Sequence, residues 1–594
     1  MTDSHNIIGS DQIRTKFVTT VQKADPKEIV FEDDILVSKF MINNVVFTRE
    51  SMMEARKSFY ELSDQVKLGG NNSLELDNQD IEKRAICVGK KFGWPDWLSA
   101  SVFWLIHGEI VSIPTETVYG LASSALSASA VKKIYEAKGR PSDNPLIVHI
   151  SSLEMLSSLI NNTHDKIIVG SNGDMSGIPK VYHELIDSFW PGPLTIILPR
   201  PNNDLIPDNI LGNVQVNSTV AFRFPSHPVA RAIIACSNLP LAAPSANSSG
   251  KPSPTIASHV EADLRGLIPL VIDSGSCTFG LESTVVDAVS NSLPTMSSEN
   301  VEISQIDEYN LTTNTATNSD TKQLVKIPCV LRPGGITVEQ IMQMKNKNIL
   351  NEPKNLKTQN NNIDLWKQIQ VYGKTFANKV IESAPTTPGM KYKHYSPQAQ
   401  VSLFIPQSPN HSNHTVENNS SIKKEMIKSI IEIIQNTSTT TKFTNKTLEK
   451  SSRIDDKEPT FNNSNEYRIG VIVIEDGSFS WNKALCNLQL ENNISDNQKP
   501  SKYQISLVNY DFNSPKKPST NILSSNRNDG DGFVNVIVAI VSGIDGLGNS
   551  MFGLLRLMDD FNVEKVLVEG VAEIGQGLAI MNRLKKAATI HISH

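Results

Sequence analysis

Short hydrophobic runs separated by polar or helical stretches fill the central part of the chain, from Asp96 to about Met344. They read EIVSIP, PLIVHI, LTIIL, TVAFRF, LPLAAPS, PLVIDSG, ESTVVD and PCVLRPGG. Runs of about five to eight residues, bounded by Gly, Pro and Ser, are typical of strands. Because several of them are separated by patterns of helical period, this region predicts a mixed α/β sheet.

One helix in this region is well marked. Apolar residues recur with helical spacing from Ala130 to Ala137, and the pattern stops before Gly139. Glycine is the residue that most often ends a helix, because it accepts a left-handed backbone. This places Lys138 in the last turn and Arg140 just beyond it, at a helix end of the kind that is usually exposed.

The chain divides into four parts that differ in their pattern of hydrophobic and polar residues. Residues 1–95 mix short apolar runs with polar spacers, and we assign them no function. The α/β region 96–344 follows, then a linker over 345–397, and then a second α/β region over 398–594. Polar inserts interrupt the two α/β regions at 161–180, 290–322, 409–465 and 513–529. We expect the last two to be disordered, because Asn, Ser and Thr bury too little apolar surface to offset ordering entropy.

Composition points to a globular protein of several domains. A chain of 594 residues has room for about two to four domains. No window approaches the roughly 18 apolar residues that suggest a membrane helix, and the first residues lack the apolar run of a secretory signal. We therefore expect a cytoplasmic protein with no membrane partner, and a mitochondrial fraction is an alternative that stays open.

Charge and cysteine content exclude several classes of protein. The net charge of −6 argues against a protein whose whole surface binds nucleic acid, but it is compatible with a local basic cleft. The five cysteines, Cys87, Cys236, Cys277, Cys329 and Cys486, form no C-x-x-C pair. Neither a disulfide framework nor a zinc site is encoded, so we expect no resident metal and interpret these residues as buried thiols.

Two segments of the α/β region suit phosphate binding, although neither P-loop nor Rossmann glycine motifs are present. In KGRPSDNP, Lys138 and Arg140 flank a glycine, so both cations can converge on one anion. In PSAN, Ser245 and Asn247 follow an apolar strand, where open α/β sheets usually bind ligands. The spacing fits equally a basic helix end that balances the helix dipole, with Ser245 and Asn247 as helix caps.

Further polar residues lie within or beside predicted strands. These are Thr115, Glu116, Thr117, His149, Thr219, Arg223, Ser283 and Arg332. A single histidine in an apolar strand, such as His149, also suits a hydrogen-bonded core residue. We interpret Glu116 as a hydrogen-bond anchor, since no second carboxylate lies near it in the sequence. Taken one at a time, none of these residues specifies a function.

Taken together and in order, these motifs resemble a known family. The set PTETVYGL, KGRPSDNPLIVHI, WPGPLTIIL, FRFPSHPVA, APSANSSGKPSPT, GLESTVVD and LRPGGIT is similar to the threonylcarbamoyl-AMP synthase family. Longer members carry a linker like PGMKYKHYSP and end in a helix like GLAIMNRLKKAA, and this chain has both. The resemblance implies a YrdC-like twisted mixed sheet with helices, followed by a smaller Rossmann-like α/β domain.

The resemblance implies a nucleotidyltransferase reaction. L-threonine, bicarbonate and ATP would give L-threonylcarbamoyl-AMP and diphosphate, with Mg²⁺ accompanying the ATP. The product would serve formation of N6-threonylcarbamoyladenosine in tRNA, through a separate downstream threonylcarbamoyl transferase complex. Direct contact of this chain with tRNA or double-stranded RNA stays open.

Family roles carried over to matching positions give three groups of residues. The catalytic group would be Lys138, Arg140, Ser245 and Asn247. The L-threonine and bicarbonate pocket would contain Thr117, His149, Arg223, Ser245 and Ser283. The ATP contacts would be Arg140, Asn144, Thr219, Asn247, Ser253, Arg332 and Tyr395. Which substrate Ser245 and Asn247 each contact is not implied.

Two other functions compete with this one. A carbamoyl-transfer protein of hydrogenase maturation embeds a related domain, but it should add C-x-x-C zinc-finger segments, and this chain has none. An RNA-binding module would use a concave basic sheet face. It would need basic residues spread over that face and would not explain the HYSP linker.

Overall fold

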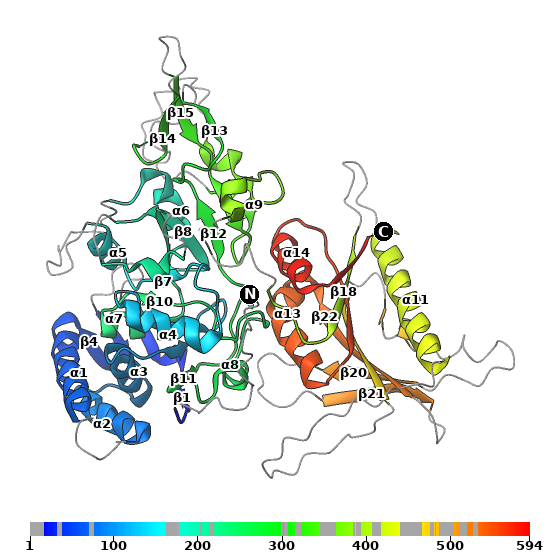
Figure 1. The fold of residues 1–594 in the computed structure, drawn as a ribbon, viewed down its shortest axis with the longest axis horizontal. Coiled ribbons are helices and arrows are strands. Elements are labelled where there is room, and N and C mark those ends of the chain that lie inside the picture. The colour runs from blue at the N-terminus through cyan, green and yellow to red at the C-terminus, as the bar shows by residue number, and fades with distance from the viewer. Residues whose placement is uncertain are drawn as a thin grey trace, which may run out of the picture. The chain divides into compact units, whose positions relative to one another are not determined.

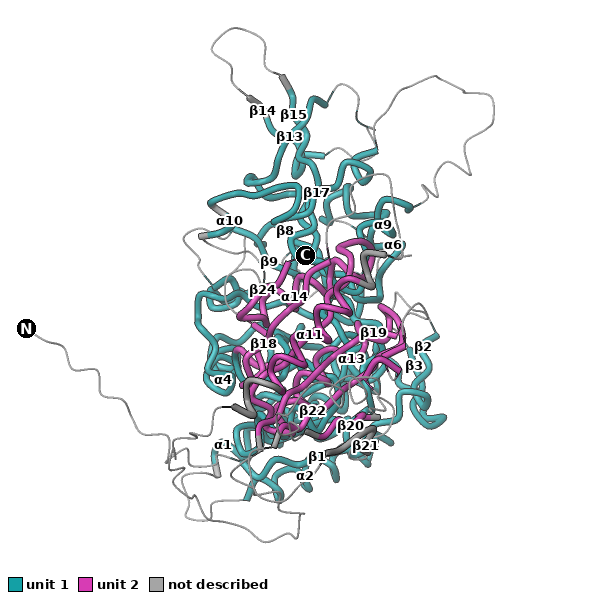
Figure 2. Tube along the Cα trace, turned by 90° about the vertical axis from the view of Figure 1, so that its right-hand side faces the viewer, with its two compact units in different colours: residues 1–249, 253–392 teal, residues 250–252, 393–594 magenta. Residues whose placement is uncertain are grey.

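The computed structural model describes most of the chain in two compact units. The described residues are 17–32, 39–69, 77–161, 175, 177–201, 205–212, 218–298, 301, 307–314, 322–344, 364–383, 387, 394–406, 417–439, 466–475, 480–481, 483–485, 503–509, 519–526 and 533–593. Unit 1 comprises Met1–Ser249 and Ser253–Tyr392, and unit 2 comprises Gly250–Pro252 and Lys393–His594 (Figure 2). Most of insert 161–180 lies outside the described residues.

Unit 1 is built on an 11-stranded mixed sheet. Across the sheet the order is β1 (Thr20–Lys23), β11 (Leu270–Asp273), β5 (Val111–Ile113), β6 (Gly120–Ser124), β10 (Leu241–Ala242), β7 (Ile147–His149), β9 (Thr219–Arg223), β8 (Leu194–Pro199), β12 (Thr284–Asp287), β16 (Cys329–Arg332) and β17 (Gln370–Val371). The predicted mixed α/β sheet is thus confirmed. Most of these strands come from the hydrophobic runs of the sequence.

Strand register aligns several polar residues in one row. His149 on β7 pairs with Arg223 on β9, and Arg223 pairs with Thr195 on β8. Thr195 pairs with Val285 on β12, which pairs in turn with Arg332 on β16. Directly paired residues of adjacent strands point to the same face of a sheet. The polar side chains of this row therefore share one face.

The predicted helix is α4 (Ala128–Lys138). It begins after Ser127, whose side chain accepts a hydrogen bond from the amide of Ala130. It ends at Gly139, which has a φ of 59° in the left-handed region, where a residue without a Cβ is favoured. Both ends follow from the local sequence.

The described residues between 26 and 106 form a layer that belongs to unit 1. The layer contains β2 (Ile29–Phe31), β3 (Lys39–Ile42), β4 (Val45–Thr48), α1 (Arg49–Gly69), α2 (Asn78–Lys90) and α3 (Asp96–Ile106) (Figure 1). Its apolar side chains share one core with α7 (Pro228–Ser237). The guanidinium of Arg231 on α7 lies 3.9 Å from the ring centre of Phe31 and 5.3 Å from that of Phe224. The layer thus packs on a helix of the α/β region.

The remaining elements of unit 1 are short. The helices are α5 (Leu153–Ile160), η2 (Lys180–Tyr182), α6 (His183–Phe189), η3 (Asp208–Ile210), α8 (Ala257–Leu264) and α9 (Val338–Met342), and η1 (Pro26–Glu28) lies in the N-terminal layer. A 3-stranded sheet contains β13 (Thr295–Ser297), β15 (Lys322–Lys326) and β14 (Leu311–Asn314). Two of its strands come from the polar insert 290–322.

The segment 345–397 differs from a plain linker. It contains η7 (Leu365–Gln368), β17 and α10 (Lys379–Ser383), and β17 extends the main sheet by pairing with β16. Leu365 and Trp366 are buried. A run as short as DLWKQIQV gives no clear period, so its place in the sheet depends on the strand that it meets.

Unit 2 has a 7-stranded, mostly parallel sheet of doubly wound type. Its elements in chain order are β18 (Gln400–Ile405), α11 (Glu417–Thr439), β19 (Glu466–Glu475), β20 (Tyr503–Asn509), β21 (Ser519–Asn526), β22 (Phe533–Ser542), α13 (Gly543–Asp560), β23 (Lys565–Glu569), α14 (Gln576–Ala587) and β24 (Ile590–Ser593). Figure 1 shows α13 and α14 on one face and α11 on the other. Crossovers that run in opposite directions along a sheet cover opposite faces.

The structure corrects two predictions of disorder in this unit. Residues 417–439 of insert 409–465 form α11, and residues 519–526 of insert 513–529 form β21, antiparallel to β20. In α11 every fourth residue from Ile422 to Ile434 is buried against the sheet. Polar composition concealed this narrow apolar stripe, which is sufficient for an amphipathic helix.

Within the described residues, no helix combines the length and the hydropathy that crossing a membrane requires.

Trp366 tests whether the 345–397 segment belongs to the folded core of unit 1. The side chain is 1% exposed, and truncating a buried Trp to Ala costs about 3 to 5 kcal/mol. We expect Trp366→Ala to lower the urea midpoint measured by circular dichroism. The exposed neighbour Lys367 supplies the control, since Lys367→Ala should change stability by no more than about 0.5 kcal/mol. Equal midpoints for the two variants would contradict a core role.

Candidate functional site

Lys138 anchors the loop that carries Ser245 and Asn247. Its Nζ donates hydrogen bonds of 2.5 Å to the backbone carbonyls of both residues. The Ser245 hydroxyl donates to Asn247 Oδ1 at 2.5 Å, and the amide of Ser249 donates to the Lys138 carbonyl. Lys138 is only 3% exposed, so the prediction of an exposed helix end was wrong for it. The three residues form one cluster.

Arg140 and Asn144 lie together just after α4. The Arg140 guanidinium donates to the carbonyl of Asn144 through Nε at 3.3 Å and to that of Pro145 through Nη2 at 2.9 Å. The Tyr135 hydroxyl also donates to the Asn144 carbonyl. These bonds fold the KGRPSDNP segment into a compact turn, so that Arg140 is held close to the end of the helix that carries Lys138.

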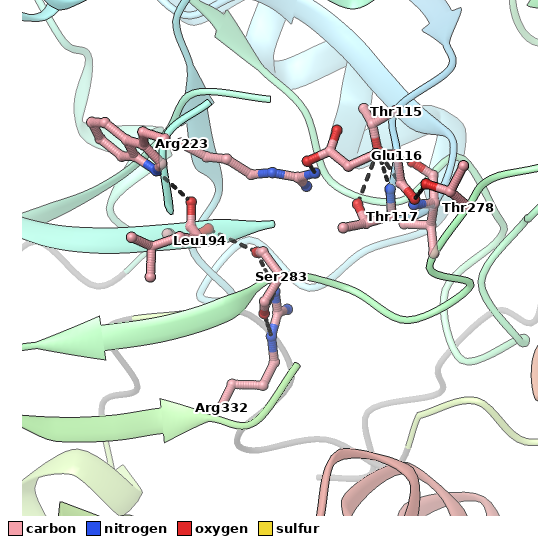
Figure 3. A network of polar contacts seen from close by, with 11 residues as sticks. Thr115, Glu116, Thr117, Leu194, Arg223, Thr278, Ser283 and Arg332 are labelled. Carbon is pink, nitrogen blue, oxygen red and sulfur yellow. Dashed lines mark hydrogen bonds and ion pairs between the residues drawn. The ribbon is translucent and has the colours of Figure 1, made fainter. Parts of the chain in front are cut away.

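Arg223 forms a buried ion pair with Glu116. Arg223 Nη2 donates to Glu116 Oε1 at 2.6 Å, and each side chain is 5% exposed. Figure 3 shows the guanidinium and the carboxylate pointing toward one another. The Glu116 carbonyl accepts hydrogen bonds from the Phe279 amide and the Thr278 hydroxyl. The loop after β5 is thereby fixed in a position where its carboxylate reaches the row of polar residues.

His149 lies beside Arg223 in that row and is neutral. Burial lowers the pKa of His149 to about 3, and the neighbouring positive charge of Arg223 contributes in the same direction. His149 Nδ1 bonds with the carbonyl of Ile147. Arg223 therefore has an uncharged neighbour on this side at ordinary pH.

Ser283, the residue before β12, also bonds to residues of this row. Its hydroxyl bonds with that of Thr195 at 2.7 Å. It also accepts from Arg332 Nη2 at 3.0 Å (Figure 3). Arg332 also donates to the Ser283 carbonyl. A Cβ on Gly334 would lie 2.3 Å from the carbonyl oxygen of Glu282. The glycines of the LRPGG motif thus allow the close backbone approach that places Arg332 on Ser283.

The other predicted site residues of unit 1 lie around these clusters. The Thr117 hydroxyl bonds with that of Thr115 at 2.9 Å, and the Ser253 hydroxyl donates to Glu282 at 2.7 Å. Thr219 begins β9, four residues before Arg223, and its hydroxyl has no hydrogen-bond partner among the described residues.

Tyr395 belongs to unit 2. Its ring packs against that of Phe552 in α13, with the ring centres 5.1 Å apart. Its φ of 66° is uncommon for a residue with a side chain. The following amide, of Ser396, donates to the carbonyl of Gly250 at 2.9 Å.

Sequence reasoning missed two members of the site and the partner of a third. Glu116, interpreted as a hydrogen-bond anchor, accepts a hydrogen bond from Arg223, a partner that the sequence did not identify. Thr195 and Glu282 were not singled out, although both bond to predicted site residues. The signal for Thr195 is a polar residue within the apolar run LTIIL. Within the described residues, no group of three His, Cys, Asp or Glu side chains could hold a metal ion.

His149 makes a prediction about stability and pH. Its folded pKa of about 3 lies below the unfolded value of about 6.5. Between these values only the unfolded chain binds the proton, so acidification favours unfolding. From pH 6.5 to 5 we expect His149 to reduce the free energy of unfolding by up to about 1.4 kcal/mol per pH unit.

Urea denaturation followed by tryptophan fluorescence measures this loss. Trp94, Trp97, Trp104, Trp190 and Trp366 all lie in unit 1. The control is His149→Gln, which should show a shallower fall over the same pH range. Identical slopes for the two proteins would contradict the assigned neutral state.

Two family models match this chain. A family model described as "Telomere recombination" matches residues 104–296, and one described as "Threonylcarbamoyl-AMP synthase, C-terminal domain" matches residues 336–589. A solved structure, P. abyssi Sua5 complexed with L-threonine, is 27% identical with a TM-score of 0.49 and covers 84% of this chain and 96% of its own.

Curated relatives agree with both matches. The threonylcarbamoyl-AMP synthase of Schizosaccharomyces pombe is 32% identical over 489 residues, which cover 81% of this chain and 85% of the relative. The enzyme of the same name from Bacillus subtilis is 38% identical and covers 53% of this chain and 68% of the relative. The chain belongs to the threonylcarbamoyl-AMP synthase family.

Proposed function

We propose that this chain is an L-threonylcarbamoyladenylate synthase, which converts L-threonine, bicarbonate and ATP into L-threonylcarbamoyl-AMP and diphosphate. The observation that carries the proposal is that unit 1 holds two groups of cationic side chains, each suited to a different anionic part of the substrates. Arg223 is buried in a row with neutral His149, which suits a small carboxylate, and Lys138 is held among loop carbonyls beside Arg140. The relatives described above carry the synthase name, which favours this function over an RNA-binding module or a hydrogenase-maturation protein.

The proposed chemistry needs charge screening more than a strong base. The threonine ammonium releases one proton to solvent, and its nitrogen then bonds to the carbon of bicarbonate while a second N–H proton leaves with the bicarbonate hydroxyl as water. The resulting carbamate is already an anionic nucleophile. A carbamate oxygen then attacks the α-phosphorus of ATP, and the bond from that phosphorus to diphosphate breaks. The attack brings negative groups together, so fixed positive charges lower its barrier.

Lys138, Arg140, Ser245 and Asn247 are the proposed catalytic residues. Lys138 bonds to the backbone that carries Ser245 and Asn247, so its charge and their side chains are fixed relative to one another. Mg²⁺ accompanies ATP as part of the substrate and neutralises its phosphates. Asn144, Thr219, Ser253, Arg332 and Tyr395 are proposed ATP contacts.

Thr117, His149, Arg223 and Ser283, with Ser245, are proposed to bind threonine and bicarbonate. A guanidinium can bind a carboxylate through two parallel hydrogen bonds, which suits Arg223. The product would then pass to a transferase complex that modifies tRNA, and the reaction would take place in the cytoplasm.

The decisive assay measures diphosphate release from ATP. We expect release to require both L-threonine and bicarbonate, and threonylcarbamoyl-AMP to accumulate in the same amount. Release that proceeds equally well without threonine would contradict the proposed function.

Lys138 tests the catalytic cluster. Lys138→Met keeps much of the side-chain volume and removes a charge-assisted contact worth about 1.5 to 3 kcal/mol. We therefore expect diphosphate release to fall about tenfold to a hundredfold. Lys132 on the same helix is exposed and pairs with Glu136, so Lys132→Met is a matched control that should retain the wild-type rate. A wild-type rate of diphosphate release in Lys138→Met would contradict a catalytic role for Lys138.

Arg223 tests the carboxylate clamp. A lysine ammonium cannot reproduce a two-point hydrogen bond to a carboxylate. We expect Arg223→Lys to raise the KM for threonine at least tenfold, which corresponds to ~1.4 kcal/mol or more, and to leave the KM for ATP within about twofold. The exposed Arg265, paired with Glu261, provides the control variant Arg265→Lys. Equal increases in both KM values would assign Arg223 a structural role.

A further inference from the structure

The Arg223 and Glu116 pair leaves one donor and one acceptor unused. A single hydrogen bond joins the two groups, and it runs from Nη2 of the guanidinium to Oε1 of the carboxylate. Within the part of the chain that the structure describes, Arg223 Nε and Glu116 Oε2 are buried and have no hydrogen-bond partner. Buried polar atoms without partners are costly and need an explanation, such as a ligand.

A pair that served only to fill the core would have a different geometry. Guanidinium and carboxylate groups match each other through two parallel hydrogen bonds, and that geometry satisfies all four atoms. The Glu116 backbone cannot move easily toward it, because the Glu116 carbonyl is held by both Phe279 and Thr278. The loop thus holds the carboxylate in one-point contact with Arg223.

The two open positions are complementary to a zwitterion. Arg223 offers an N–H to a carboxylate, and Glu116 offers an oxygen to a cationic N–H. The neighbouring histidines add no charge, since burial lowers the pKa of His149 to about 3 and that of His227 to about 4. The pair has a net charge of zero, as does a free amino acid, so binding leaves no uncompensated charge in the buried site.

We propose that Glu116 is a substrate-binding residue that accepts a hydrogen bond from the threonine nitrogen, while Arg223 binds the threonine carboxylate. This proposal rests on the proposed function. Of the three ammonium protons, the carbamate retains one after two are lost, so the nitrogen can still donate to Glu116 Oε2. The same carboxylate thus orients the substrate before and after carboxylation. It also selects amino acids over carboxylic acids that lack the amine.

The test compares inhibitors that each lack one group of threonine. (R)-3-Hydroxybutanoate lacks the ammonium, and L-2-aminobutanoate lacks the hydroxyl. In the wild type we expect threonine to bind much more tightly than (R)-3-hydroxybutanoate. Glu116→Gln keeps the shape and removes the charge, so it should reduce that preference about tenfold to a hundredfold. Its preference for threonine over L-2-aminobutanoate should change less than about threefold, or ~0.7 kcal/mol.

Two further variants separate binding from folding. Glu116→Asp retains the charge on a shorter side chain and should recover part of the preference, whereas a purely structural loss would affect all three ligands and ATP equally. Glu261 lies on α8 and pairs with Arg265, so Glu261→Gln is the matched surface control. An unchanged preference in Glu116→Gln, or a loss of the preference against L-2-aminobutanoate instead, would overturn the proposal. A wild-type protein without threonine-dependent diphosphate release would refute the proposed function itself.

Discussion

The burial of one positive charge, on Arg223, constrains the rest of the site. A guanidinium removed from water needs an acidic partner, and this partner is Glu116, 107 residues earlier in the sequence. The same loop is joined to the segment 245–254, because the Tyr119 amide donates to the Pro254 carbonyl and the Ala246 amide donates to the Tyr119 carbonyl. One ion pair thus connects the row of polar residues on the sheet with the loop that carries Ser245 and Asn247.

Local sequence predicts those features that depend on near neighbours. The limits of α4 follow from Ser127 and Gly139, and the strands follow from short apolar runs bounded by Gly and Pro. Ordered motifs also named most residues that form the clusters of unit 1. The burial of Lys138 could not be read in this way, because the carbonyls that hold it belong to residues 107 and 109 positions away. A helix end is exposed only if no distant loop covers it.

The elements that the sequence did not predict show the same limitation. The buried stripe of α11 lies within Asn- and Ser-rich sequence, and β17 has only two residues, so neither gives a strong local pattern. Each is stabilised by the sheet that it packs against or pairs with. The partner of Glu116 was not identified for a related reason, since Arg223 lies at the end of a strand that is distant in sequence. Contacts with residues that are distant in sequence determine these features more than the local pattern of hydrophobic and polar residues does.

The N-terminal layer has a practical consequence for anyone who wishes to produce the catalytic region alone. It covers α7, whose apolar residues are buried together with those of β2, β3 and α1 in one core, and it supplies the ring of Phe31 to Arg231. A recombinant chain that started at residue 96 would present this apolar surface to water. Such a surface promotes self-association. Poor solubility of the shortened protein would therefore result from the loss of the N-terminal layer that buries α7, and would not by itself indicate a defect in the catalytic region.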